Sequence, residues 1–179
     1  MIMLRRPEQE LLLPANPLFI WGSLLGAFVL NMVQNVGFWG RAAWTPDLVA
    51  LALVFWGVHQ PRRIGIGAAF LFGLVMDVHQ GSVLGQHALA YSVLNFFAIA
   101  IHRRLLWFNV MTQAVQVLPP LAAAHAVELA VRLLVGSPFP GFLLLLAPLI
   151  EALLWPVATV LLLLPQRRAP DPDANRPLL

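Results

Sequence analysis

The chain has 179 residues, of which 60% are apolar and only 11% are charged, and its mean hydropathy is +0.79. A soluble domain carries about a quarter charged residues, so this composition excludes an ordinary soluble protein and indicates a bilayer protein. The absence of cysteine excludes a disulfide framework and thiolate metal sites. All eleven basic residues are arginines, mostly in short pairs between apolar runs, which excludes an extended nucleic-acid-binding face.

The first segment, residues 1–16, contains two arginines, acidic residues and prolines. It lacks a short apolar core followed by a small-residue cleavage site, so we expect a cytoplasmic N-terminal segment and no removable signal peptide. Residues 166–179 are rich in proline and charge, which predicts a disordered cytoplasmic tail. Between these ends, residues 17–165 are predicted to form one transmembrane domain.

Six apolar runs follow one another along this domain. They are Leu18–Val36, Pro46–His59, Ile64–Val78, Leu84–Ile101, Phe108–Val135 and Gly141–Leu164. A span needs about 20 residues, and the second and third runs reach that range if they extend back to Arg41 and forward to Gln80. Pro119 and Pro120 predict a kink in the fifth run, which we interpret as one span, and prolines predict irregularity in the sixth.

The arginines predict the orientation of these runs. With a cytoplasmic N-terminus, only Arg41 and Arg132 fall on the outer side. The other nine fall inside, as the positive-inside rule requires: Arg5, Arg6, Arg62, Arg63, Arg103, Arg104, Arg167, Arg168 and Arg176. The predicted fold is therefore an all-α integral membrane protein, a compact bundle of six transmembrane helices with both termini in the cytoplasm.

The stretch GLVMDVHQGSVLGQHALA then forms an outward-facing hairpin between spans three and four. Asp77, His79 and His87 could be metal ligands or a proton relay, but their spacing does not match the close pairs of known sites. Ser82 in GSVLG resembles a nucleophile elbow only superficially. We favour a structural role, in which glycines turn the chain and Asp77 accepts hydrogen bonds from the Gly81–Gly85 turn or from His87.

Ionisable residues inside a span are costly and are candidates for function. Glu128 and Arg132 stand at i, i+4, the spacing at which opposite charges meet and can neutralise each other. Glu151 has no partner in its own span, so we expect it to be protonated or paired with Arg132 or His125 of span five. A proton relay through His125, Glu128 and Glu151 is the alternative.

Small residues line the third run, including Gly65, Gly67 and Gly73. Small residues allow close helix approach in membranes, so we expect the third span to be central in the bundle.

Several of these features, taken in order, resemble the rod shape-determining protein MreD family of Gram-negative bacteria. The matching residues are Pro46-Asp47-Leu48, Trp56 with His59-Gln60-Pro61, Arg63 with Gly65 and Gly67, and Gly73, Asp77, Gly81 and Gly85-Gln86-His87-Ala88-Leu89. The similarity is clearest over residues 44–106. It implies a multi-pass inner-membrane scaffold of the elongasome, without catalysis or cofactors.

The resemblance also implies partners: the MreC protein, and in a larger complex the MreB filament, the RodA glycosyltransferase and the elongation transpeptidase. The candidates for structural or partner-binding roles are Asp47, Arg63, Gly73, Asp77, Gly81, Gly85, Gln86, His87, Glu128, Arg132 and Glu151. No catalytic, cofactor or metal-ligating residue is assigned.

The rival interpretation is the substrate-binding membrane subunit of a small-solute, vitamin-type transporter, which also suits a compact six-helix bundle. A carrier needs a polar cavity that several spans line together. The candidates for its lining are Asn31, Gln34, Asn35, Gln86, His87 and Asn95.

Overall fold

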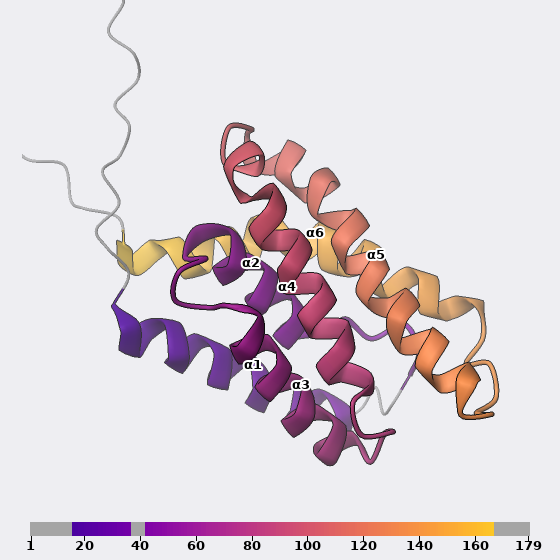
Figure 1. Cartoon of the computed structure of the whole chain (residues 1–179). Coiled ribbons are helices and arrows are strands. Elements are labelled where there is room, and N and C mark those ends of the chain that lie inside the picture. Colours follow the sequence, from indigo (N-terminus) through magenta and orange to yellow (C-terminus); the bar gives the residue numbers. More distant parts are fainter. Residues whose placement is uncertain (1–15, 37–41, 167–179) are drawn as a thin grey trace, which may run out of the picture.

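A computed structural model describes residues 16–36 and 42–166 (Figure 1). Within these residues all regular structure is helical, with six α-helices and two short 3₁₀ helices. The α-helices are α1 (Pro17–Val36), α2 (Leu48–His59), α3 (Ile66–Gln80), α4 (Gln86–Leu105), α5 (Val110–Leu134) and α6 (Leu146–Leu163). The 3₁₀ helices η1 (Phe142–Leu145) and η2 (Leu164–Gln166) extend α6 at its two ends.

The six predicted helical elements are confirmed, but the backward extension of the second to Arg41 is wrong. Residues 42–47 are not helical, and α2 begins at Leu48. The reason is local, because Asp47 is an N-cap whose side chain accepts hydrogen bonds from the amides of Val49 and Ala50. The extension of the third element to Gln80 is confirmed, and α5 continues as one helix through Pro119 and Pro120.

By length and composition, three stretches are long and apolar enough to cross a membrane: Pro17–Asn35, Val110–Leu134 and Phe142–Gln166. Helices α2 and α3 are apolar but shorter, with 12 and 15 residues. Helix α4 has 20 residues and ends in His102, Arg103 and Arg104. The predicted terminal segments lie outside the described residues, except for Asn16 and Gln166. Arg41 also lies outside the described residues.

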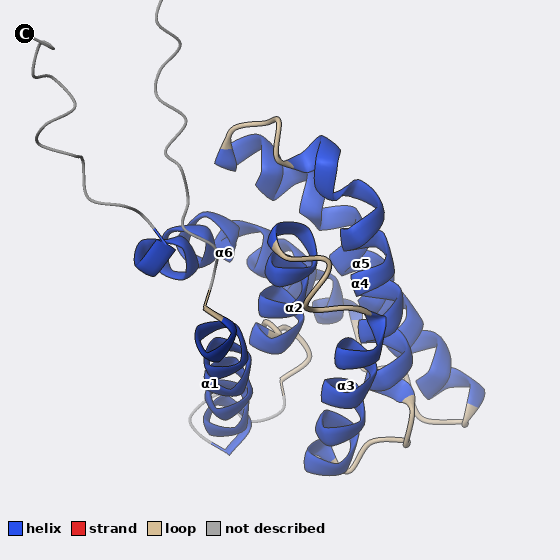
Figure 2. Ribbon diagram, turned by 60° about the vertical axis from the view of Figure 1, so that its left-hand side comes forward, coloured by secondary structure: helices blue, strands red, loops and turns tan. Residues whose placement is uncertain are grey.

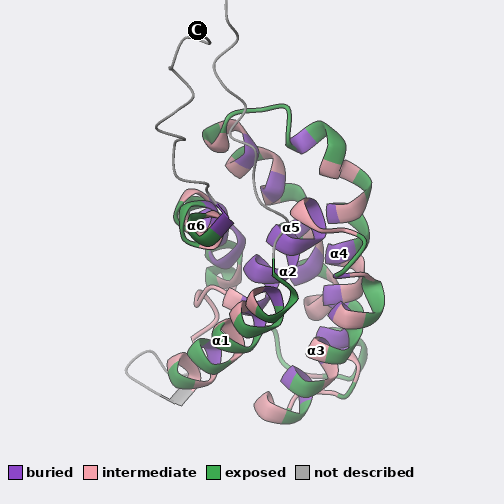
Figure 3. Ribbon diagram, turned by 90° about the vertical axis from the view of Figure 1, so that its left-hand side faces the viewer, coloured by how far each residue is buried: buried purple, intermediate pink, exposed green. Residues whose placement is uncertain are grey.

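The central helix is α2, and the prediction that the third element would be central is wrong. Helix α2 contacts α1, α4, α5 and α6, and its residues from Val49 to Val58 are all buried (Figure 3). Its sequence, LVALALVFWGVH, is apolar on every face, which is the pattern of a helix enclosed by others. Helix α3 packs mainly on α4 and exposes large apolar side chains such as Leu71 and Val78.

Gly73 is the glycine of α3 that allows a close approach to a neighbouring helix. A Cβ atom on Gly73 would lie 2.3 Å from the Cα atom of Ala88, so this glycine lets α3 approach the backbone of α4. Gly65 and Gly67 have open space around them. The turn after α3 uses two more glycines, because Gly81 and Gly85 have φ angles of 61° and 99° that disfavour other residues.

Consecutive helices pack against each other from α3 to α6, and α4 and α5 run side by side (Figures 1 and 2). The start of α1 and the end of α6 lie at the same side of the molecule in both views. At the opposite ends of these helices, the turn between α3 and α4 approaches the end of α1 and the start of α2. That junction holds most of the polar residues discussed next.

Candidate functional site

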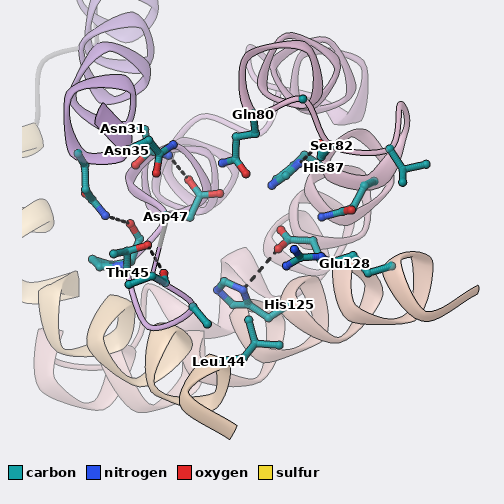
Figure 4. Close-up of a pocket in the computed structure, with 18 of the residues that line it drawn as sticks. Asn31, Asn35, Thr45, Asp47, Gln80, Ser82, His87, His125, Glu128 and Leu144 are labelled. Carbon is teal, nitrogen blue, oxygen red and sulfur yellow. Dashed lines mark hydrogen bonds and ion pairs between the residues drawn. The ribbon is translucent and has the colours of Figure 1, made fainter. Parts of the chain in front are cut away.

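A polar cavity of about 310 Å³ opens where several helices begin or end (Figure 4). Its wall comes from the end of α1, the segment before α2, the α3–α4 turn and the second half of α5. The polar and charged lining residues are Asn31, Gln34, Asn35, Thr45, Asp47, Gln80, Ser82, Gln86, His87, His125, Glu128, Arg132 and Ser137. We refer to this space as the polar cavity.

Asp47 joins four helices at one wall of the polar cavity. Its Oδ1 atom accepts hydrogen bonds from the Nδ2 atom of Asn31 in α1, at 2.7 Å, and from two amides in the first turn of α2. Its Oδ2 atom accepts a hydrogen bond from the hydroxyl of Tyr91 in α4. Its backbone N–H donates to Oε1 of Glu151 in α6, at 2.8 Å. The carboxylate is therefore fully engaged by the protein.

Glu151 is completely buried and pairs with His125 of α5. The Nε2 atom of His125 lies 2.9 Å from Oε1 of Glu151, which confirms one of the two partners expected for this carboxylate. The other expected partner, Arg132, forms no ion pair with Glu151 among the described residues. A buried carboxylate is stabilised by such a pair, and this one also accepts the amide of Asp47.

The predicted pair between Glu128 and Arg132 is not formed as a salt bridge within 4 Å in the described part of the chain. The nearest cationic partner of Glu128 is His125, whose Nδ1 atom lies 3.7 Å from Oε2. Both Glu128 and Arg132 line the polar cavity. The i, i+4 spacing permits a contact but does not require it, because the side chains can turn toward the open space instead.

Asp77 accepts hydrogen bonds from the α3–α4 turn and from His87, the donors that the sequence predicted, and it thereby caps the start of α4. Its oxygens accept hydrogen bonds from the amide of Gly85 at 2.8 Å, from the amide of His87 at 2.8 Å and from the hydroxyl of Ser82 at 2.9 Å. The Nδ1 atom of His87 lies 2.7 Å from Oδ1. A carboxylate at a helix N-terminus is favoured by the helix dipole, so Asp77 of α3 fixes the position of α4.

The structure does not bring the other hairpin candidates into a reactive arrangement. His79 lies against the ring of Phe28 and does not join Asp77 and His87. Ser82 lies 3.3 Å from Nδ1 of His87, the same nitrogen that contacts Asp77, whereas a nucleophilic triad uses the two opposite ring nitrogens. Among the described residues no group of three His, Asp or Glu side chains is placed to hold a metal ion.

Five of the six side chains considered for a carrier line the polar cavity. The exception is Asn95, which is buried beside Gly57 and donates to the carbonyl of Ile64. Arg63 is exposed in the turn between α2 and α3 and does not line the polar cavity.

A model of the family described as rod shape-determining protein MreD matches residues 15–164. The chain belongs to the MreD family. A curated relative, the rod shape-determining protein MreD of Haemophilus influenzae, is 36% identical over 96 residues. That match covers 50% of this chain and 59% of the relative, so the chain spans a little over half of the relative's length. No solved structure matches.

For this MreD-family chain, sequence reasoning missed Tyr91, which bonds Asp47, and three residues that line the polar cavity: Thr45, Gln80 and Ser137. Tyr91 is the only tyrosine in the sequence, and its burial in an apolar helix was a usable signal, because a buried phenol needs a hydrogen-bond partner. Gln80 ends α3 and lines the polar cavity. Nothing in its sequence context separates it from a solvent-exposed helix end.

Proposed function

We propose that this protein is a non-catalytic scaffold in the inner membrane that maintains rod shape and supports lateral peptidoglycan synthesis within the elongasome. The observation that carries this proposal is the match of the MreD family model over residues 15–164, which spans all six α-helices. The relative from Haemophilus influenzae carries the same description.

We propose further that all six helices are embedded in the bilayer with both termini in the cytoplasm. Three helical stretches have the length and composition of membrane spans. The start of α1 and the end of α6 lie on the same side of the molecule (Figure 1). The short helix α2 is about 18 Å long, but it is enclosed by other helices and need not meet lipid along its length. Exposed arginine pairs after α2 and at the end of α4 support a common cytoplasmic side.

The proposed mechanism is binding, with MreC as the direct partner and MreB, RodA and the elongation transpeptidase in the larger complex. The carboxylates of Asp47, Asp77 and Glu151 support a role without catalysis, since all three accept hydrogen bonds from backbone amides and hold helices in place. The proposed docking region for a partner is the α3–α4 turn with Gly81 and Gly85, together with Gln86 and His87 at the start of α4.

Two measurements test this proposal together. Depletion of the protein should convert rods to round cells, and the wild-type chain should restore the rods. Purification in mild detergent should recover a single-pass periplasmic partner of the MreC type without crosslinking. Normal rods after complete depletion would refute the shape role. Repeated recovery of the folded protein without that partner would refute the scaffold mechanism.

The polar cavity favours the second candidate, a substrate-binding subunit of a small-solute transporter, because such a subunit requires a polar space lined by several helices. Its test is separate. A carrier predicts that depletion abolishes uptake of one solute and that cells supplied with the downstream product keep their shape.

A further inference from the structure

Two buried side chains in the lining of the polar cavity carry hydrogen-bonding groups, Gln86 and His125. Gln86 is only 4% exposed and lines the cavity, where its side-chain amide is available to a bound molecule. His125 is 9% exposed, and its Nδ1 atom is buried without a hydrogen bond among the described residues, with Oε2 of Glu128 at 3.7 Å. Buried polar groups are nearly always paired in native proteins, so the Nδ1 atom of His125 is a group that a molecule in the cavity would satisfy.

The cavity also presents one negative and one positive group: Glu128, whose only ion pair among the described residues is with His125 at 3.7 Å, and Arg132, which forms none there. Glu128 and Arg132 lie one helical turn apart on α5, and both line the cavity without forming a salt bridge to each other. The carboxylates of Asp47 and Asp77 are occupied by hydrogen bonds from α1, α2 and α4. Glu128 is therefore the carboxylate best placed to receive a cation from outside.

A molecule that complements this lining carries an ammonium group and a carboxylate close together, with further polar atoms for the amides of the wall. A volume of about 310 Å³ lies at the lower end of ligand pockets, which span roughly 300–1,000 Å³. An amino acid or a dipeptide has this charge pattern and this size.

We propose that the polar cavity binds a small zwitterion of the amino-acid or dipeptide class, with Glu128 receiving its ammonium group and Arg132 its carboxylate. Gln86 and the imidazole of His125 hydrogen-bond to the polar atoms between the two charges. Because the walls belong to α1, the segment before α2, the α3–α4 turn and α5, the bound molecule joins elements that are distant in the sequence.

The test uses the full-length protein, purified in detergent and dialysed extensively, with three probes in calorimetric titration. Alanylalanine carries both charges, alaninamide only the cation and N-acetylalanine only the anion. Alanylalanine should bind, and each single-charge probe should bind at least about tenfold more weakly, because each charge-assisted hydrogen bond contributes at least that factor. This comparison needs no variant and is therefore independent of folding defects.

Variants then test which residue binds which charge of the ligand. Glu128→Gln should remove the preference for alanylalanine over N-acetylalanine, and Arg132→Gln should remove its preference over alaninamide. Arg103→Gln, an exposed arginine outside the cavity, should bind as the wild type does. Failure of alanylalanine to bind at millimolar concentration, as expected of a cavity that holds only water, would overturn the proposal. Equal binding of the three probes would overturn it as well. Cell shape and partner recovery are measured separately, so the shape role does not depend on this result.

Discussion

Single residues determine how closely the helices approach, and Gly73 is the clearest case. A Cβ atom there would lie 2.3 Å from the Cα atom of Ala88 and 2.5 Å from its nitrogen, which are backbone atoms that cannot move aside. Gly67 is also in α3 but faces open space. The same substitution at the two positions therefore separates helix packing from helix propensity.

We expect Gly73→Ala to lower the free energy of unfolding by about 1–3 kcal/mol, the usual cost of overpacking a close contact. Gly67→Ala should be neutral or stabilising by about 0.5–1 kcal/mol, because alanine favours a helix. Thermal unfolding of both variants in the same detergent measures the difference. Equal stability of the two would show that the α3–α4 contact is looser than described.

The side chain of Asp77 acts only as a hydrogen-bond acceptor, so the side-chain amide of asparagine replaces it poorly. Its Oδ2 atom accepts the N–H of Gly85, and its Oδ1 atom accepts from Ser82 and His87. In Asp77→Asn the amide nitrogen must face one of these donors, so we expect a loss of about 1–3 kcal/mol. Asp77→Ala should lose more. A fully stable but functionally dead Asp77→Asn protein would instead indicate that the charge has a role beyond capping.

The buried pair of His125 and Glu151 should show strong coupling. Removing His125 alone, as in His125→Leu, leaves a buried carboxylate without its partner and should cost about 3–5 kcal/mol. The double variant His125→Leu with Glu151→Leu should recover part of this loss, because neither charge remains. Chemical denaturation of the four proteins of this cycle gives the coupling energy. Additive losses would contradict a direct pair.

At the scale of elements, α2 and α3 are both short apolar helices but have different surroundings. Leu53 in α2 is completely buried, whereas Leu71 in α3 is 62% exposed. We expect Leu53→Ala to destabilise the protein by about 2–5 kcal/mol, as large-to-small core changes do. Leu71→Ala should change stability by less than about 1 kcal/mol. Similar losses at the two positions would mean that α3 is as enclosed as α2.

The sequence predicted the helical elements well, because apolar runs between proline, glycine and charged turns mark helix ends locally. The Asp77 cap was predictable for the same reason, since its donors lie within eleven residues. The central position of α2 could not be predicted in this way. Small residues in α3 indicate that another helix lies close, but they do not indicate which helix lies at the centre. The contact of Glu128 was also misassigned, since i, i+3 and i, i+4 partners compete and only the fold decides between His125 and Arg132.

For the whole molecule, the proposed topology places the turns after α2 and α4 in the cytoplasm and the polar cavity at the outer face. The chain contains no cysteine, so single cysteines can be introduced without a background. Cysteine at Arg62 or Arg103 should react only from the cytoplasmic side, and cysteine at Ser137, beside the cavity, only from the periplasmic side. Labelling of intact cells with a membrane-impermeant maleimide measures this. Reaction at position 62 or 103 in intact cells would overturn the orientation.

The bond between the amide of Asp47 and the carboxylate of Glu151 spans 104 positions of the chain, and this has a consequence for the order of synthesis. The ribosome completes α2 long before it reaches α6, and earlier segments generally fold first. The start of the central helix therefore obtains its last acceptor only when the final helix has been made and inserted. A chain that stops before α6 therefore lacks the acceptor for the amide of Asp47, and we expect it to be less stable than the complete chain.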